Sequence, residues 1–528
     1  MDFLLAILPI AFLIYVMTKR GSWPSHISLP CAATLVYLIA LVHFRLDPNL
    51  VNATVVNGAL SALTPISIIW GAILLSQTMR RSGAERTIGE WLKEVSANPV
   101  AQLMIVGWAF PFMIEGSSGF GTPAAIAAPL LVGLGFEAAP VAILTLVMNS
   151  VPTTFGAVGT PMWFGFSQVP LSPSEVLSVS WKSALVHSVA ALFVPIIALR
   201  FVVGWAEIRQ NLLYVYLSIL SCVLPSLALS RFNYEFPSLI GGAVGLGLSV
   251  LMAKRQLGLA PAHAGNEGKI GPPPKRYERA RAFAPYLMLI AILIVTRVPL
   301  LPFRAWLNAE SPALTLDLGS LGRLSASIAL VLRLDSIFGA ASVWSYNALF
   351  VPALIPFVLV VLLSLPLLRI NIHALKTAIA DTTRRLRGPS VTLAAALIMV
   401  QLMMLGGDDA QTMIIGRTFA TLTGRSWPFF APLLGALGAF FAGSATISNL
   451  TFAGIQDSMA RMLGFERTLI LALQSVGAAM GNMIAIANIV AVTSILGLVS
   501  LDGVILKRTL LPFVIYGLVA GVSGLILT

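Results

Sequence analysis

Long apolar runs separated by short polar stretches recur along most of the chain. The clearest runs cover residues 2–18, 99–114, 182–199, 236–253, 283–296, 347–366 and 509–527. A helix needs about 20 apolar residues to cross roughly 30 Å of hydrocarbon, and these runs reach or approach that length. A transmembrane β-barrel would show short alternating segments instead. The pattern therefore predicts an all-α polytopic membrane protein, with roughly eleven to fourteen crossings.

Composition and charge agree with a membrane protein. Of the 528 residues, 57% are hydrophobic and only 10% are charged, whereas about a quarter of a soluble domain is charged. The net charge of +12 could indicate a nucleic-acid partner. In a membrane protein, however, excess Lys and Arg collect in cytoplasmic loops and set the orientation. We therefore expect a lipid bilayer, and not nucleic acid, as the partner.

The ends of the apolar runs indicate how the chain is organised. Residues 254–282 are polar and rich in Pro and Gly, with seven Lys or Arg against two Glu. This stretch is predicted to be a cytoplasmic connector between a first membrane repeat at 1–253 and a second at 283–528. The mixed segment 302–345 is predicted to face the opposite side, with interfacial helices. The run at 2–18 precedes its positive charges, so we expect a retained helix and not a cleaved signal.

Two related stretches indicate an internal repeat. "EGSSGFGTPAAIAAPLLVGLGFE" (115–137) and "AGSATISNLTFAGIQDSMARMLGFE" (442–466) each open with small polar residues and close on Leu-Gly-Phe-Glu. Each is followed by an apolar helix and then by a second block, "NSVPTTFGAVGTP" (149–161) or "QSVGAAMGNMIAIAN" (474–488). The amphipathic pieces ahead of the two copies carry four and two Lys or Arg, which favours opposite sides of the membrane. We therefore predict two inverted repeats.

Glycine and proline inside the repeated stretches predict re-entrant helical hairpins at 116–135 and 443–464, each followed by a broken helix. Irregular backbone at membrane depth is tolerated only where it is buried in protein or lines a wet cavity. Two such interruptions at matching positions point to the binding site of a transporter. For any single small residue, close helix packing is the simpler explanation. Taken together, the two clusters favour a cargo site.

The residues of these clusters suit a small carboxylate. Helix N-termini offer free N–H groups and a positive dipole end, short hydroxyl and amide side chains add neutral donors, and neither predicted tip contains Lys or Arg. The predicted substrate-binding residues are Ser117, Ser118, Gly119, Gly121, Thr122, Asn149, Thr153, Thr154, Ser444, Thr446, Ser448, Asn449, Gln474, Asn482 and Asn488.

Three titratable residues are candidates for carrying a coupled proton. Glu115 comes first, because an acid inside the membrane is a functional candidate by default; its alternatives are a wet helix end or a structural cap. Asp457 is a candidate too, although it lies four residues before Arg461 and a structural pair is the simpler interpretation. His187 is a candidate because the unperturbed pKa of histidine lies in the useful range, but a single membrane histidine is more often bonded to a neighbouring helix.

The motifs resemble those of the lactate permease family of bacterial proton-coupled carriers. "EGSSGFGTPAAIAAPLLVGLGF" is similar to the family's Glu-Gly-x-x-Gly-Phe-Gly-x-Pro signature, and "NSVPTTFGAVGTP" to the block that follows it. "AGSATISNLTF" and "GNMIAIANIVA" resemble the two C-terminal blocks. The chain departs from the family at Ala445, where relatives have Asp or Asn, and at Ala487, where many have His. A larger or more apolar acid therefore stays open as the cargo.

The resemblance implies symport of a short 2-hydroxymonocarboxylate (L-lactate, D-lactate or glycolate) with a proton. It also implies an elevator-type fold like that of the ion-transporter superfamily, in a bacterial cytoplasmic (inner) membrane, as a monomer or homodimer. The rival functions are a carrier of another small organic anion, a membrane-embedded enzyme and a channel. The five histidines are scattered and no phosphate-binding loop ending in Lys-Ser or Lys-Thr is present, so we expect no enzyme, metal or cofactor.

Overall fold

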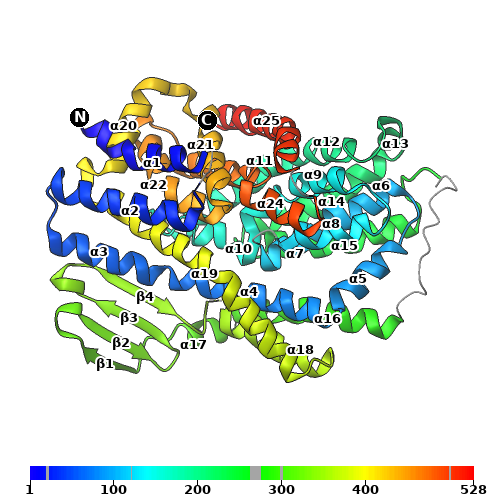
Figure 1. Cartoon of the computed structure of the whole chain (residues 1–528), viewed down its shortest axis with the longest axis horizontal. Coiled ribbons are helices and arrows are strands. Elements are labelled where there is room, and N and C mark those ends of the chain that lie inside the picture. Colours follow the sequence, from blue (N-terminus) through cyan, green and yellow to red (C-terminus); the bar gives the residue numbers. More distant parts are fainter. Residues whose placement is uncertain (19–22, 120–121, 262–274, 298–300, 352, 499–500) are drawn as a thin grey trace. The chain divides into compact units, whose positions relative to one another are not determined.

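The computed structural model describes residues 1–18, 23–119, 122–261, 275–297, 301–351, 353–498 and 501–528 (Figure 1). The chain is mostly helical. In these residues ten helices are long and apolar enough to cross a membrane, or eleven if the bent pair Ala138–Met148 and Pro152–Trp163 counts as one span. Shorter apolar helices, at Asp2–Met17, Thr122–Val132 and Ala353–Leu367, account for the larger number that the apolar runs predict. The protein is a multi-pass membrane protein.

The chain divides into two compact units. The first unit contains Met1–Ser82 and Ala284–Leu422, and the second contains Gly83–Phe283 and Thr423–Thr528. Each unit thus combines segments from the N-terminal and C-terminal parts of the sequence.

The first unit is a set of long helices beside a small sheet. Its helices are α1 (Asp2–Thr18), α2 (Ser25–Val42), α3 (Pro48–Ser61), α4 (Leu63–Arg81), most of α16 (Arg276–Arg297), α17 (Phe303–Leu307), the π-helix η5 (Ala353–Val358), α18 (Leu359–Leu367), α19 (Ile372–Met403) and α20 (Gln411–Thr423). Helix α19 is the centre of this unit, since it packs against α2, α3 and α4. Its N-terminus is capped by Asn371, whose side chain accepts a hydrogen bond from the Ala374 amide.

A four-stranded antiparallel sheet corrects the all-α prediction. Its strands, in spatial order, are β1 (Ala313–Asp317), β2 (Arg323–Ser327), β3 (Val331–Asp335) and β4 (Val343–Asn347), and β4 packs against α3. The register places Leu316 opposite Leu324, Leu324 opposite Leu334, and Leu334 opposite Trp344. Alternate residues face one side of a strand, so these positions form one apolar face. Residues 313–335 form strands and not a helix, because the strand geometry places the leucines of this stretch on one side.

The second unit holds both copies of the predicted repeat. Its elements from the first part of the chain are α5 (Ala84–Lys93), α6 (Pro99–Gln102), η1 (Leu103–Ala109), α7 (Phe110–Ser118), α8 (Thr122–Val132), α9 (Ala138–Met148), η2 (Pro152–Phe155), α10 (Gly156–Trp163), α11 (Pro173–Ala191), α12 (Val194–Arg200), α13 (Trp205–Gln210), α14 (Leu212–Ser230) and α15 (Pro237–Lys254). From the last part come α21 (Trp427–Ala442), α22 (Ala445–Leu463), α23 (Arg467–Gly481), α24 (Ile486–Ile495) and α25 (Asp502–Leu527).

Both predicted hairpins need a correction in where they turn. In the first copy, α7 ends at Ser118 and α8, which packs back against α7, begins at Thr122. In the second copy, the segment predicted to turn within 443–464 is one continuous helix, α22, and the turn precedes it at Gly443, with φ +65°. The arms of each hairpin are therefore the preceding apolar helix and the repeated segment itself. The Ser, Thr and Gly residues inside α22 have helical backbone, and the left-handed backbone that a turn requires occurs at Gly443 before the helix and at Gly464 after it.

The first copy contains a sharply bent helix, as predicted, and the second contains a helix interrupted after Gly481 within one candidate span. Helix α9 is followed by η2 and α10 with a bend of 58°, and Ala157, Val158 and Gly159 have positive φ. In the second copy, α23 ends at Gly481 and α24 begins at Ile486. The two copies interlock, because α10 of the first contacts α22 of the second, while α24 of the second contacts α8 of the first.

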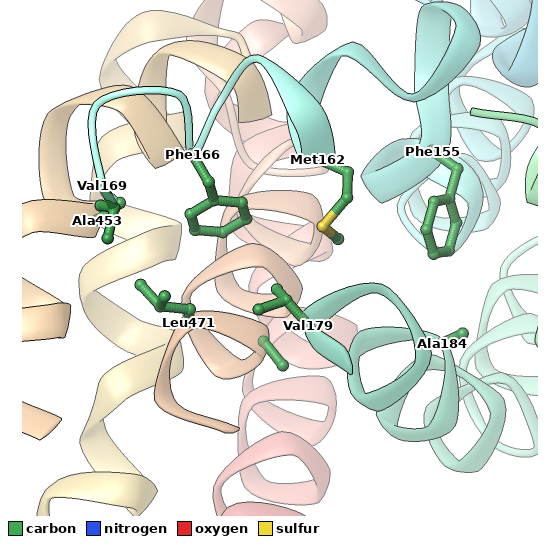
Figure 2. Packing of buried hydrophobic residues seen from close by; sticks show 9 residues of the cluster. Phe155, Met162, Phe166, Val169, Val179, Ala184, Ala453 and Leu471 are labelled. Atoms are coloured by element: carbon green, nitrogen blue, oxygen red, sulfur yellow. The ribbon is translucent and has the colours of Figure 1, made fainter. Parts of the chain in front are cut away.

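An apolar cluster holds the first broken helix against the second copy (Figure 2). It consists of Phe155, Met162, Phe166, Val169, Val179, Ala184, Ala453, Leu471 and Ala472, all nearly inaccessible to solvent. In Figure 2, Met162 and Phe166 point from the segment after the break toward Val179 on α11 and Leu471 on α23. Burying large side chains of this kind stabilises the contact by about 1.5–3 kcal/mol each. The segment that follows the break is therefore held firmly against α11 and α23.

Glycines let α15 approach α7 until backbones touch. A methyl group at Gly242 would overlap the backbone of Met113, and one at Gly116 would overlap the backbone of Leu239. Backbone cannot swing aside as a side-chain end can, so the two helices would have to separate. Gly247, also on α15, has open space around its Cα.

We expect Gly242→Ala to lower the midpoint of thermal unfolding in detergent, because overpacking costs about 1–3 kcal/mol. Gly247→Ala is the matched control, since both variants gain about 1 kcal/mol of helix propensity and only one meets the backbone of α7. Equal midpoints for the two variants would contradict the close α7–α15 contact.

Candidate functional site

A small cavity lies inside the second unit, where the two copies of the repeat meet; its empty space, including the part open to solvent, is about 290 Å³. It is lined by Glu115, Gly119, Thr153, Gly156, Ala157, Pro161, Gly443, Ser444, Ala445, Thr446 and Asn482. These residues come from the end of α7 and from the first helix break, and from the Gly443 turn, the start of α22 and the second helix break.

Glu115 is the one ionisable side chain among the described lining residues. It lies on α7 and is only 2% exposed. The Asn149 side-chain amide donates a hydrogen bond to its Oε2, with an N–O distance of 3.1 Å. Gly156 lies directly against Oε1, and a Cβ at that position would overlap it. The Asn149 Oδ1 atom is buried without a hydrogen-bond partner in the described part of the chain.

The isolation of Glu115 extends beyond the cavity wall. The elements that pack against α7 are α8, α10, α15, η1 and η2. Over their described lengths, the one charged residue that they carry is Lys254, the last residue of α15. An acid in such a place has no opposite charge to balance it, and burial favours its neutral form over its charged form.

The start of α22 faces the cavity with unpaired donors. Ser444 is the N-cap and accepts a hydrogen bond from the Ile447 amide at 3.4 Å. The first N–H groups of a helix, here those of Ala445 and Thr446, have no intrahelical acceptor and form the positive end of the helix dipole. Thr446 is 2% exposed and lines the cavity. No hydrogen bond of its hydroxyl group occurs among the described residues.

The two helix breaks touch each other at the cavity. The Thr153 hydroxyl donates to the Asn149 carbonyl at 2.6 Å and accepts from the Asn482 side-chain amide at 3.5 Å. The Asn488 amide in turn donates to Asn482 Oδ1 at 2.5 Å. A polar path therefore joins the break of one copy to the break of the other.

A second layer of polar side chains lies behind the cavity wall. The Asn449 amide donates to the carbonyl oxygen of Pro161 at 2.9 Å, which satisfies backbone freed by the first break. The Gln474 amide donates to Ser448 Oγ at 3.2 Å and to Asn449 Oδ1 at 3.4 Å. The Ser448 hydroxyl donates to the Gly435 carbonyl at 2.6 Å. This layer holds α21, α22 and α23 together around the cavity.

Comparison with known proteins assigns the chain to a family. The family model described as "L-lactate permease" matches residues 2–528. The chain belongs to the L-lactate permease family. An L-lactate permease homologue of Haemophilus influenzae is 47% identical over 533 residues, covering 100% of this chain and 98% of the relative.

More distant relatives differ in the cargo in their names. The L-lactate permease of Escherichia coli is 26% identical over 505 residues, and the glycolate permease of Escherichia coli is 25% identical over 518 residues. Each alignment covers 91% of this chain and 88% of the relative. Among solved structures, the YdaH transporter of Alcanivorax borkumensis matches with a TM-score of 0.46 and 15% identity, over 99% of this chain and 98% of that chain.

In this family member, the cavity gathers part of the predicted binding set. Gly119, Thr153, Ser444, Thr446 and Asn482 line it, together with Glu115, the first candidate for carrying the proton. Asn149, Thr154, Ser448, Asn449, Gln474 and Asn488 lie in hydrogen-bonded layers around it, and Thr122 is at the start of α8. The hydroxyls of Ser117 and Ser118 instead donate to the Ile114 carbonyl, at 2.9 and 3.1 Å. Gly121 lies outside the described residues.

Five lining residues were not predicted individually: Gly156, Ala157, Pro161, Gly443 and Ala445. Three of them belong to the repeated block at 149–161, so the block was visible in the sequence. The individual roles of these residues could not be predicted, because they line the cavity with backbone atoms or small side chains, and no residue type is specific for that role.

Asp457 belongs to a charged network away from the lining residues. Its carboxylate accepts from Arg461 at 2.9 Å and from Arg467 at 2.5 Å, and Arg467 also pairs with Glu175 at 3.0 Å. The predicted pair with Arg461 is confirmed. In the loop just before α23, hydrogen bonds from Lys182 and Thr468 lower the pKa of Glu466. These ion pairs fasten α11 to the α22–α23 connection.

No metal site accompanies these charges. Over the described ranges, no group of three or more His, Cys, Asp or Glu side chains could hold a metal ion.

We expect Asp457→Asn to lower the thermal unfolding midpoint, because Arg467 would lose its closest anion in a largely buried place. Breaking this ion pair should lower the free energy of unfolding by about 1–3 kcal/mol. Arg461→Gln is the matched control, since the Arg461 side chain is 50% exposed and exposed pairs contribute about 0–1 kcal/mol. Differential scanning fluorimetry in detergent measures both, and the prediction is wrong if the two variants melt together.

Proposed function

We propose that this chain is a secondary transporter, and not an enzyme, that carries a short 2-hydroxymonocarboxylate (L-lactate, D-lactate or glycolate) together with a proton. One observation carries the proposal: an isolated carboxyl group, Glu115, and the N-terminus of α22 line the same small cavity. The names of the relatives, L-lactate permease and glycolate permease, support the cargo class.

The shared cavity gives a physical reason for coupling. A substrate carboxylate and an ionised Glu115 would place two negative charges in the same small cavity. In a protein interior, charge repulsion at such range amounts to about 4 kcal/mol at 4 Å for an effective dielectric constant of 20. A proton on Glu115 removes that repulsion. By linkage, the anion strengthens proton binding as much as the proton strengthens anion binding, so the loaded form carries both.

The proposed pose assigns the two ends of the cargo. Its carboxylate accepts hydrogen bonds from the Thr446 hydroxyl and from the free N–H groups at the start of α22. Its 2-hydroxyl group meets Thr153 and Asn482, which can accept and donate. Its alkyl part meets Ala157, Pro161 and Ala445, the apolar lining residues. The site contains dipoles and hydroxyls in place of Lys or Arg, so the anion is held without being trapped.

We further propose the repeat organisation and the movement. The repeats are 1–253 and 283–528, in opposite orientation, joined by the cytoplasmic connector 254–282, with hairpins that re-enter a bacterial inner membrane. The reciprocal contacts of α10 with α22 and of α24 with α8 support this pseudo-symmetry. All lining residues belong to the second unit. An elevator-type movement of that unit would carry cavity and cargo together.

Glu115→Gln should separate cargo binding from proton coupling. A glutamine is the neutral analogue of protonated glutamate and can still accept from Asn149, so we expect lactate exchange between liposomes and medium to continue. Accumulation of lactate driven by a pH gradient alone should fall to the background level, because no proton is carried. Glu137→Gln, in the exposed turn before α9, is the control and should accumulate lactate normally.

The result that overturns this role is continued accumulation by Glu115→Gln against a lactate gradient with pH as the sole driving force. Failure of the wild-type protein to move lactate or glycolate in the same liposomes would overturn the proposed function itself.

Thr446→Val should weaken cargo binding. The variant keeps the side-chain shape but removes a hydroxyl that hydrogen-bonds a charged group, worth about 1.5–3 kcal/mol. We therefore expect KM to rise about tenfold or more, with a smaller change in maximal rate. Thr451→Val is the matched control, because Thr451 lies on the same helix and its hydroxyl, among the described residues, bonds the Ile447 carbonyl alone, at 2.8 Å. An unchanged KM in Thr446→Val would remove the α22 N-terminus from the site.

A further inference from the structure

Four buried polar side chains behind the first helix break form a hydrogen-bonded chain that the proposed cargo site does not use. They come from four elements: Tyr516 from α25, His187 from α11, Thr154 from η2 and Ser475 from α23. None is more than 3% exposed. Tyr516 contacts His187 Nδ1, and His187 Nε2 lies 2.6 Å from the Thr154 hydroxyl. That hydroxyl lies 3.4 Å from the Ser475 carbonyl oxygen.

Counting donors and acceptors fixes the direction of this chain. Within the described structure the Tyr516 hydroxyl has one hydrogen-bond partner, His187, so it must donate to Nδ1 or leave a buried proton unpaired. A buried unsatisfied donor costs about 1–3 kcal/mol. With Nδ1 accepting, His187 carries its proton on Nε2 and donates it to Thr154. The Thr154 hydroxyl is then free to donate to the Ser475 carbonyl. Every group in the chain is satisfied when His187 is neutral.

A charged His187 would leave one proton of this hydrogen-bonded chain without an acceptor. The second proton would sit on Nδ1 and point at the Tyr516 oxygen, which would force the tyrosine proton away from its acceptor. No carboxylate contacts His187 in the described structure to compensate. Lys182, five residues earlier on α11, bonds Glu466 and Thr468. The other charged residues on α11 and on the elements packed against it (α10, α12, α14, α23 and α25) are Glu175, Arg200, Arg467, Asp502, Lys507 and Arg508; α14 adds the titratable Tyr214, Tyr216 and Cys222.

The chain ends on the backbone segment that shapes the cavity. Thr154 follows Thr153, and the two side chains serve opposite sides of η2: Thr153 lines the cavity, while Thr154 reaches His187 and α23. Ser475 also accepts, at 3.5 Å, from Asn449, the residue that donates to the Pro161 carbonyl at the far end of the break. Both ends of the irregular segment are thus anchored to the same place on the second copy.

We propose that His187, in its neutral Nε2–H form, is a positioning residue that fixes the conformation of the first helix break, and that it does not carry the coupled proton. Through Thr154 it sets where Thr153 and Pro161 stand in the cavity wall. The transport arm of its test rests on the proposed function, whereas the conformational arm does not.

The experiment compares four variants with the wild type. His187→Gln keeps one donor and one acceptor and cannot titrate near neutral pH. His187→Leu and Thr154→Val each remove the link between α11 and the break, and Tyr516→Phe removes only the outer donor. Hydrogen–deuterium exchange of peptides covering 150–165, in detergent without cargo, reports the conformation of the break. Lactate uptake in proteoliposomes across a range of pH reports coupling.

For His187→Gln we expect wild-type exchange in 150–165 and an unchanged pH profile of uptake. Thr154→Val and His187→Leu should exchange at least about tenfold faster there, and their KM should rise about tenfold, as for the loss of about 1.4 kcal/mol, with no shift of the pH profile. Tyr516→Phe should fall between the two groups. Rescue of His187→Leu behaviour by Gln is the signature of positioning.

Two results would overturn the proposal. The first is a folded His187→Gln protein with normal exchange in 150–165 but no proton-driven accumulation or a displaced pH profile, since His187 would then carry the proton. The second is wild-type exchange in 150–165 for Thr154→Val. This measurement decides the question even if His187→Leu does not fold. If the wild-type protein moves no lactate, the proposed function fails, while the exchange measurements still decide the positioning role.

Discussion

The structure depends on one constraint: backbone polar groups released by a broken helix must find partners in a place without water. In the first break, the Pro161 carbonyl is bonded by Asn449 and the Pro152 carbonyl by the Ser238 hydroxyl, at 2.8 Å. Neither donor belongs to the broken helix. An unpaired buried carbonyl costs several kcal/mol in hydrocarbon, so the break exists only because α15 and α22 supply these donors. The polar residues that look out of place in apolar sequence are there to satisfy backbone.

The same constraint produces the electrostatics of the cavity. Backbone satisfied by neutral amides and hydroxyls needs no charged residues, and the surrounding helices can therefore be almost free of charge. Glu115 then stands alone against Gly156, bonded by a single amide. This isolation from countercharges is the feature on which the proposed coupling of cargo and proton rests. Close packing between α7 and α15, made possible by Gly116 and Gly242, leaves little space for water between these two helices.

Much of this could be predicted from the sequence where the signal is periodic or repeated. Apolar run lengths indicated the helices, and the repeat located both breaks and placed Glu115, Ser444 and Thr446 at one site. The second hairpin turn was predicted too late, because Gly and Ser inside α22 keep helical backbone and the left-handed glycines, Gly443 and Gly464, lie at the two ends of this helix. The sheet was not predicted, because each strand is only five residues long and the alternation of Leu316, Leu324 and their neighbours lies in a segment of mixed polarity. Lining by Gly156 and Pro161 depends on backbone geometry, which residue identities alone do not reveal.

The division of each unit between distant segments has a consequence for biosynthesis. Glu115 and the first break emerge from the ribosome early, whereas Ser444, Asn449 and Asn482 belong to Thr423–Thr528, the last part of the second unit to be made. The Pro161 carbonyl therefore lacks the hydrogen bond from Asn449 until the intervening chain has been synthesised. Assembly of the cavity therefore follows the synthesis of this last part, and a chain truncated before Asn449 would contain the first break without the donor that bonds the Pro161 carbonyl.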